Sequence, residues 1–198
     1  MTVAQIRIAL ASGFPAIFGI SDVSFIENFI KQEDLDKIKQ EDLDKNNKQD
    51  KPKNIKLGQV RITKENYDKL PKPTPPKNII GHALVAVGYD DNLEFYLDLD
   101  SSEKDGYNLD LTKEPIKGGF LFRDSRVLID SQGNELRDSQ GKKLAWGDNG
   151  YGWIPYEYVE KGLATDWWSL LNAEWINTSG FGIATDQILG QNSVGGRP

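Results

Sequence analysis

Residues 81–91 read Gly-His-Ala-Leu-Val-Ala-Val-Gly-Tyr-Asp-Asp, and this stretch decides the fold. Every side chain in 83–87 is apolar, which is typical of a strand buried on both faces. Residues 88–91 have the composition of a turn, so we expect the strand to end there. Alternating apolar and polar residues predict a half-buried strand over 93–99, and two phenylalanines predict another strand around 120–122. The pattern predicts antiparallel β-structure.

A few short helices are expected beside these strands. Apolar residues at helical spacing predict a helix over 2–12, and an apolar run predicts a strand over 16–20. A second helix is predicted over 21–30, capped by its first residue, and a third over 155–159, with proline in its first turn. Residues 170–176 predict a last strand. The expected fold class is α+β, a mainly antiparallel β-sheet or partial barrel with a few short helices.

Two polar segments divide this pattern. Residues 31–78 contain an eight-residue tandem duplication and a proline-rich stretch, so we predict an inserted polar loop whose first half is either a surface helix or disordered. Residues 126–145 repeat Asp-Ser-Gln-Gly at a spacing of eight, which predicts inserted consecutive short hairpins. We therefore expect one domain over 1–177, with these two insertions, and a flexible tail over 178–198.

Composition excludes several classes of function. The 198 residues hold 24 Lys and Arg against 30 Asp and Glu, and a net charge of -6 has the wrong sign for nucleic acid or an anionic membrane. The chain has no Cys, which excludes disulfides, thiolate zinc sites and a cysteine nucleophile within it. A single His excludes multi-histidine metal sites. We expect no metal and no organic cofactor.

The sequence contains no apolar run near the roughly 20 residues that span a bilayer. Its amino terminus has no basic region of the kind that opens a signal peptide, and Arg7 interrupts the apolar stretch that follows. From these two observations we expect a cytoplasmic protein.

Three motifs in order carry a resemblance to a known family. They are the stretch 81–91, then Gly-Phe-Leu-Phe-Arg-Asp-Ser at 119–125, then Trp-Gly-Asp-Asn-Gly-Tyr-Gly at 146–152. Together they resemble the papain-like (C1) cysteine peptidases, and residues 154–159 and 164–169 look like the bacterial branch. The resemblance implies the carboxy-terminal, β-rich half of that fold, its right-hand half.

The resemblance also implies roles for single residues. His82 matches the catalytic general acid and base, although from the residues alone a lone His on a strand is either a proton carrier or a hydrogen-bonded core residue. Asp124 stands where the family has the Asn that orients the imidazole, and as an anion it would favour the protonated ring. Arg126 replaces the Trp that shields this hydrogen bond. Trp146 either packs under a turn or, with Ala83, lines the substrate cleft.

Three hypotheses for function remain open. The family's Cys nucleophile and oxyanion Gln have no counterpart here, so the first is a papain-like cysteine-type peptidase domain that is inactive alone. The second is one half of a split cysteine peptidase, which a Cys-bearing partner completes and which hydrolyses peptide bonds through a thioester. The third is a module that binds peptides or a peptidase through its Trp side chains, chiefly Trp146, Trp153, Trp167 and Trp168.

Overall fold

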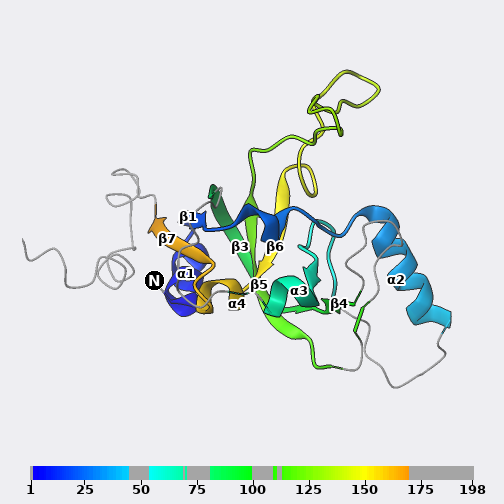
Figure 1. Ribbon diagram of the computed structural model, residues 1–198. Coiled ribbons are helices and arrows are strands. Elements are labelled where there is room, and N and C mark those ends of the chain that lie inside the picture. Colours follow the sequence, from blue (N-terminus) through cyan, green and yellow to red (C-terminus); the bar gives the residue numbers. More distant parts are fainter. Residues whose placement is uncertain are drawn as a thin grey trace, which may run out of the picture.

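The computed structural model describes residues 2–44, 54–68, 70, 81–99, 109–110 and 113–169. Its centre is a five-stranded sheet in the order β6-β5-β3-β1-β7, in which all pairings are antiparallel (Figure 1). These strands are β1 (Ala16–Ile20), β3 (His82–Phe95), β5 (Ile116–Arg123), β6 (Tyr151–Pro155) and β7 (Ala164–Ser169). The α+β class, with a mainly antiparallel open sheet and a few short helices, is confirmed. The predicted last strand at 170–176 and the predicted tail at 178–198 lie outside the described residues.

The longest strand, β3, differs from its prediction. It does not end at 88–91 but continues through them to Phe95. Its register against β5 shifts at 86–88 and again at 90–94, so the residues that resemble a turn are accommodated as bulges. The prediction of burial on both faces is also wrong, because the buried side chains of Leu84 and Ala86 lie on one face of β3, whereas Ala83 and Val87 on the other face are exposed, Val87 to 41%.

The core lies between the sheet and the helices on that one face. Helix α1 (Val3–Ala11) begins with a capping box at Thr2 and packs Ile6 against the sheet. Helix α4 (Glu157–Glu160) contributes the fully buried Tyr158. The sheet supplies many of the other large core side chains, among them Phe18, Ile20, Leu84, Phe95, Phe120, Phe122 and Ile154. Helix α1 and strand β1 confirm the predictions for 2–12 and 16–20.

The second predicted helix is reduced to one 3-10 turn, Val23–Ile26. Asp22, rather than the predicted Ser21, caps it by accepting a hydrogen bond from a backbone N–H at 2.9 Å. Beyond the turn the backbone is extended, because residues 29–30 pair with residues 58–60. This pairing gives hydrogen-bond partners to backbone N–H and C=O groups that would have bonded to one another within a helix.

The segment 31–78 contributes more than a polar loop. Its described part comprises α2 (Gln32–Asp44), β2 (Ile62–Thr63) and α3 (Lys64–Asp68), and β2 pairs in parallel with β4 (Leu97–Asp98). Helix α2 realises the surface-helix alternative and buries Leu35 and Ile38. Val60 and Ile62 are buried in the main core, so this stretch is also part of the packed structure. The proline-rich stretch lies outside the described residues.

Residues 126–145 form a protruding arm, seen at the top of Figure 1. Each Asp-Ser-Gln-Gly copy makes a turn in which the Gly N–H donates to the Asp carbonyl, at 3.1 Å in the first copy and 3.0 Å in the second. The backbones of Leu128, Leu136 and Leu144 form a closed ring of N–H···O=C bonds of 2.8–2.9 Å, each leucine donating to one of the other two. At the base of the arm, the Trp146 N–H donates to the Arg126 carbonyl at 3.1 Å.

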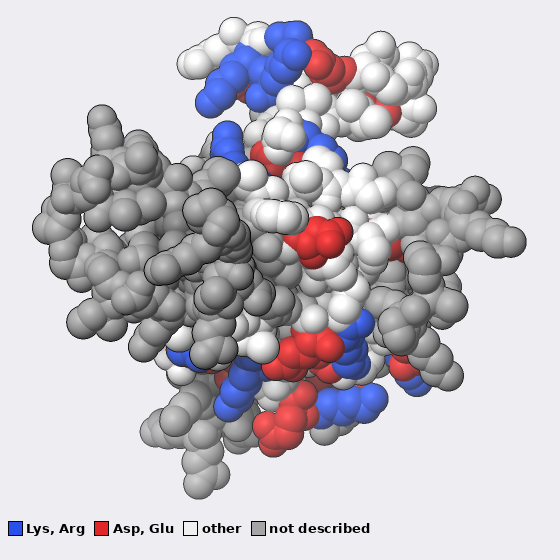
Figure 2. All heavy atoms as spheres, turned by 90° about the vertical axis from the view of Figure 1, so that its left-hand side faces the viewer, with Lys and Arg blue, Asp and Glu red and all other residues white. Residues whose placement is uncertain are grey.

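The described surface carries both signs of charge close together. Figure 2 shows blue and red side chains intermingled on one face of the molecule. Ion pairs among the described residues include Arg7 with Asp91 and Lys56 with Asp90. Within the described residues, every helix is too short or too polar to cross a lipid bilayer.

Candidate functional site

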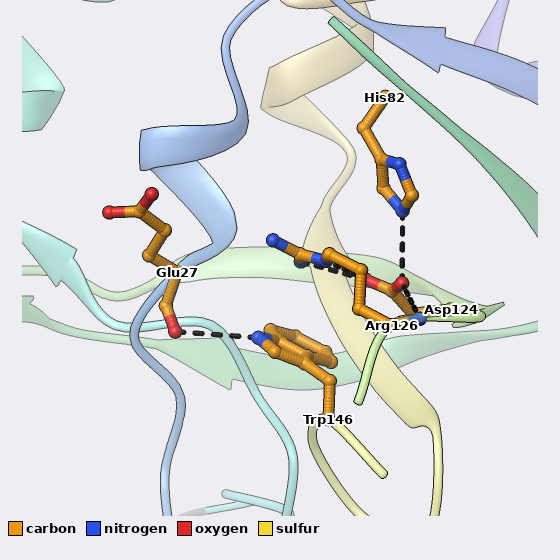
Figure 3. A network of polar contacts seen from close by, with 5 residues as sticks. All are labelled: Glu27, His82, Asp124, Arg126 and Trp146. Atoms are coloured by element: carbon orange, nitrogen blue, oxygen red, sulfur yellow. Dashed lines mark hydrogen bonds and ion pairs between the residues drawn. The ribbon is translucent and has the colours of Figure 1, made fainter. Parts of the chain in front are cut away.

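His82 and Asp124 meet at the end of the sheet where β3 begins and β5 ends. His82 is the first residue of β3, and Asp124 follows Arg123, the last residue of β5. Because the two strands are antiparallel, these ends are adjacent. Nε2 of His82 lies 2.9 Å from Oδ1 of Asp124 (Figure 3). The structure thus brings together the two residues that the sequence suggested as a catalytic pair.

The hydrogen bond fixes which imidazole nitrogen is available. An ionised carboxylate only accepts hydrogen bonds, so Nε2 carries the hydrogen and donates it to Asp124. In the neutral ring Nδ1 is then the proton-accepting nitrogen. Among the residues that the structure describes, none forms a hydrogen bond with Nδ1, and the His82 side chain is 21% exposed. The pair therefore presents one basic nitrogen outward, held in a fixed orientation.

Asp124 is a buried anion with several donors around it. Its residue exposure is 1%, and burial by itself favours the neutral acid. The Arg126 Nε–H donates to Oδ2 at 2.9 Å, the Arg126 backbone N–H donates to Oδ1 at 2.8 Å, and His82 adds a third hydrogen bond. Together these contacts outweigh burial and hold the pKa of the Asp124 carboxyl below its ordinary value of 3.8.

Arg126 is a member of the site that the sequence analysis missed. The sequence analysis considered it only as the replacement of an aromatic shield, whereas its guanidinium forms an ion pair with Asp124, with Nη2 2.7 Å from Oδ2. Only the Nε contact has the geometry of a hydrogen bond. The sequence does hold a signal for this pair. An acidic residue directly after a strand, with a basic residue two positions later, is local enough to fold into contact.

Trp146 forms the floor beneath this ion pair. Its ring is 4% exposed, with centroids 4.7 Å from Phe29 and 5.4 Å from Phe122. The Arg126 guanidinium carbon lies 5.2 Å from the ring centroid, within range of a cation–π contact. The indole Nε1–H donates to the Glu27 carbonyl at 3.4 Å (Figure 3). The structure thus realises the packing role that we had considered for Trp146.

The turn after Trp146 requires its glycines. Gly147, Asn149 and Gly150 all have positive φ, a conformation that glycine and asparagine tolerate best. A Cβ on Gly150 would lie 2.5 Å from the Arg123 guanidinium and 3.2 Å from the Asp124 carbonyl. The Gly150 carbonyl accepts a hydrogen bond from the Asp124 N–H at 2.8 Å. The Trp-Gly-Asp-Asn-Gly motif thus positions the backbone that carries Asp124.

The structure does not bring Ala83 into this group. Ala83 is exposed and follows His82 in β3, so strand alternation directs its side chain to the opposite face. Three other tryptophans that the structure describes make their contacts elsewhere. Trp153 packs under the Lys56 ammonium, Trp167 stacks on Phe18, and Trp168 is 70% exposed.

Neither a group of metal ligands among the described residues nor a match to a known protein identifies the function. Among the described residues, no three His, Cys, Asp or Glu side chains gather into a possible metal site. No family model, no curated protein and no solved structure matches this chain.

Proposed function

We propose that this chain is a papain-like cysteine-type peptidase domain, equivalent to the β-rich half that bears the catalytic histidine, and that it is inactive alone. The observation that carries the proposal is the His82–Asp124 pair, in which a buried carboxylate holds Nε2 at 2.9 Å and Nδ1 remains available. The order of the three motifs supports the same assignment. Inactivity follows from the chain's own composition, because no residue in it can supply a thiolate.

The pair is suited to proton transfer beside an external thiol. Nδ1 of His82 would take the proton of a cysteine, the resulting thiolate would attack the peptide carbonyl, and the imidazolium would protonate the departing amine. Water would then hydrolyse the thioester, with His82 accepting and returning its proton. Asp124 would hold the ring in one orientation throughout, in the place of a neutral amide.

The first test measures hydrolysis of a panel of fluorogenic peptides by the purified chain. We expect no turnover above the level of a His82→Ala variant, because the chain lacks a nucleophile. Reproducible hydrolysis by the wild type that disappears in His82→Ala would overturn the proposed inactivity.

A second candidate function is the split peptidase, which is favoured by a partly exposed His82 whose Nδ1 has no hydrogen-bond partner among the described residues. Its test is a pull-down of the tagged chain from native lysate with a thiol-directed peptidase probe, followed by mixing the purified components. A labelled partner that hydrolyses peptides with the wild-type chain but not with His82→Ala would establish it. Recovery of the folded chain without a labelled partner would contradict it and leave the inactive domain.

A further inference from the structure

The charge balance of Asp124 gives a role to Arg126. Asp124 is buried and in contact with two groups that can carry positive charge, His82 and Arg126. A buried carboxylate without a compensating cation is strongly disfavoured. If His82 were its only partner, loss of the imidazole proton would leave the Asp124 carboxylate without a compensating positive charge. Deprotonation of His82 would then be opposed.

Arg126 removes this constraint. A guanidinium keeps its proton over the whole range in which an imidazole titrates, so Asp124 is balanced in both states of His82. Its Nε–H and backbone N–H bind both carboxylate oxygens and fix the plane of the carboxylate. The guanidinium itself is held over the buried Trp146 ring. The Arg126 guanidinium therefore has a fixed position, with the Trp146 ring packed against it.

We propose that Arg126 is a positioning residue that keeps Asp124 charge-balanced and oriented while His82 gains or loses a proton at Nδ1. The use made of that proton rests on the proposed function, whereas the effect of Arg126 on His82 is a property of this chain alone. In this arrangement the Asp124–Arg126 pair has no net charge and acts toward the imidazole as a neutral acceptor.

The other charged groups nearby are engaged elsewhere within the described residues. They lie at the start of the 3-10 turn, at the end of β5, in the turn before β6 and on β7. Asp22 accepts from Ser24, Arg123 donates to the Asn149 carbonyl, Asp148 accepts from Asn149, and Asp166 accepts from Thr165. The Glu27 carboxylate points away from the site in Figure 3. Each of these groups keeps its charge, but among the described residues Asp124 is the one that forms a hydrogen bond with the ring, and Arg126 is the cation that contacts Asp124.

The test uses the fact that His82 is the only histidine. A ¹H–¹³C spectrum of the whole chain gives one imidazole Cε1–H signal, whose titration midpoint is followed across neutral pH. We expect Arg126→Gln to move the midpoint upward by about one pH unit, a tenfold change in proton affinity, because only protonated His82 then balances Asp124. Arg126→Lys should restore most of the wild-type behaviour. Arg137→Gln, an arginine on the arm that pairs with Glu135, is the matched control and should not move it.

Asp124→Asn is a second variant with the opposite expected effect. With it, the test does not require Arg126→Gln to fold. Asp124→Asn should lower the midpoint, since Arg126 then faces a neutral amide, and the double variant Asp124→Asn with Arg126→Gln should fall between the two single variants. An unchanged midpoint in folded Arg126→Gln, or in folded Asp124→Asn, would overturn the role of Arg126. No thiol partner takes part in this titration, so it tests the role of Arg126 alone. The proposed function is tested separately, by the pull-down with the thiol-directed probe and by the hydrolysis assay.

Discussion

Gly152→Ala is expected to destabilise the protein because the added methyl group would overlap the Phe122 and Trp146 rings, which pack beneath the site. A Cβ on Gly152 would lie 2.6 Å from Cζ of Phe122 and 2.9 Å from Cη2 of Trp146, against about 3.5–4.0 Å for a normal carbon contact. Phe122 is fully buried and Trp146 nearly so, so neither ring has free space to enter. Overpacking of this kind costs about 1–3 kcal/mol, and the lower entropy of the unfolded alanine chain offsets about 0.4–1 kcal/mol. The expected net loss is about 1–2 kcal/mol.

The assay is equilibrium unfolding in urea, followed by tryptophan fluorescence, with thermal unfolding as a second measure. A loss of this size lowers Tm by about 5 °C in a protein of this length. Gly88→Ala is the matched control, because its Cβ would lie 3.6 Å from the nearest atom of Leu121, an ordinary contact. We expect the control to stay within about 0.5 kcal/mol of wild type. Equal stability of Gly152→Ala and wild type, or an equal loss in both variants, would refute the reasoning.

Three further predictions concern single contacts. The lowered pKa of Asp124 means that its contribution to stability is complete above about pH 4, the pKa of an unfolded Asp, and is lost as pH falls through the folded value. The urea midpoint should therefore drop between pH 5 and pH 2.5 more steeply in wild type than in Asp124→Asn, and parallel curves would contradict this. Tyr158→Phe should cost about 1 kcal/mol in urea unfolding, because the buried hydroxyl donates to the Phe25 carbonyl at 3.3 Å; an unchanged midpoint would show that this bond contributes nothing. Thr2→Ala should lower the thermal stability by about 1 kcal/mol through loss of the α1 cap, whereas Thr2→Ser should retain it.

The sequence predicts the elements whose signals are local. Helix α1 and strand β1 lie where apolar spacing placed them, and the α+β class follows from the alternating strands. The end of β3 was predicted wrongly, since residues 88–91 resemble a turn, but Gly88, Tyr89 and Asp90 pair with β5 and Asp91 lies in the bulge that follows. That pairing joins residues far apart in sequence, and no local pattern reveals it.

The site likewise contains residues that the sequence predicts and residues whose roles needed the tertiary structure. The resemblance pointed to His82 and Asp124, and the structure brings them together because the strand ends that carry them are adjacent in the sheet. The ion pair of Arg126 was missed because its replacement of an aromatic residue was treated as a loss of packing rather than as a gain of charge. The burial of Trp146 depends on Phe29, a residue more than a hundred positions earlier in the chain, so its role needed the tertiary structure.

The arm over 126–145 has a consequence for how the length of this chain can change. It leaves the domain and returns at two residues joined by a backbone hydrogen bond, so insertion there costs little closure entropy, about 0.6 kcal/mol for each doubling of length. Its repeat is eight residues, an even number, so an added copy keeps the side chains of extended segments on the faces they already occupy. The base of the arm is thus a point where tandem duplication can lengthen the protein in whole units while Asp124, Arg126 and Trp146 keep their places.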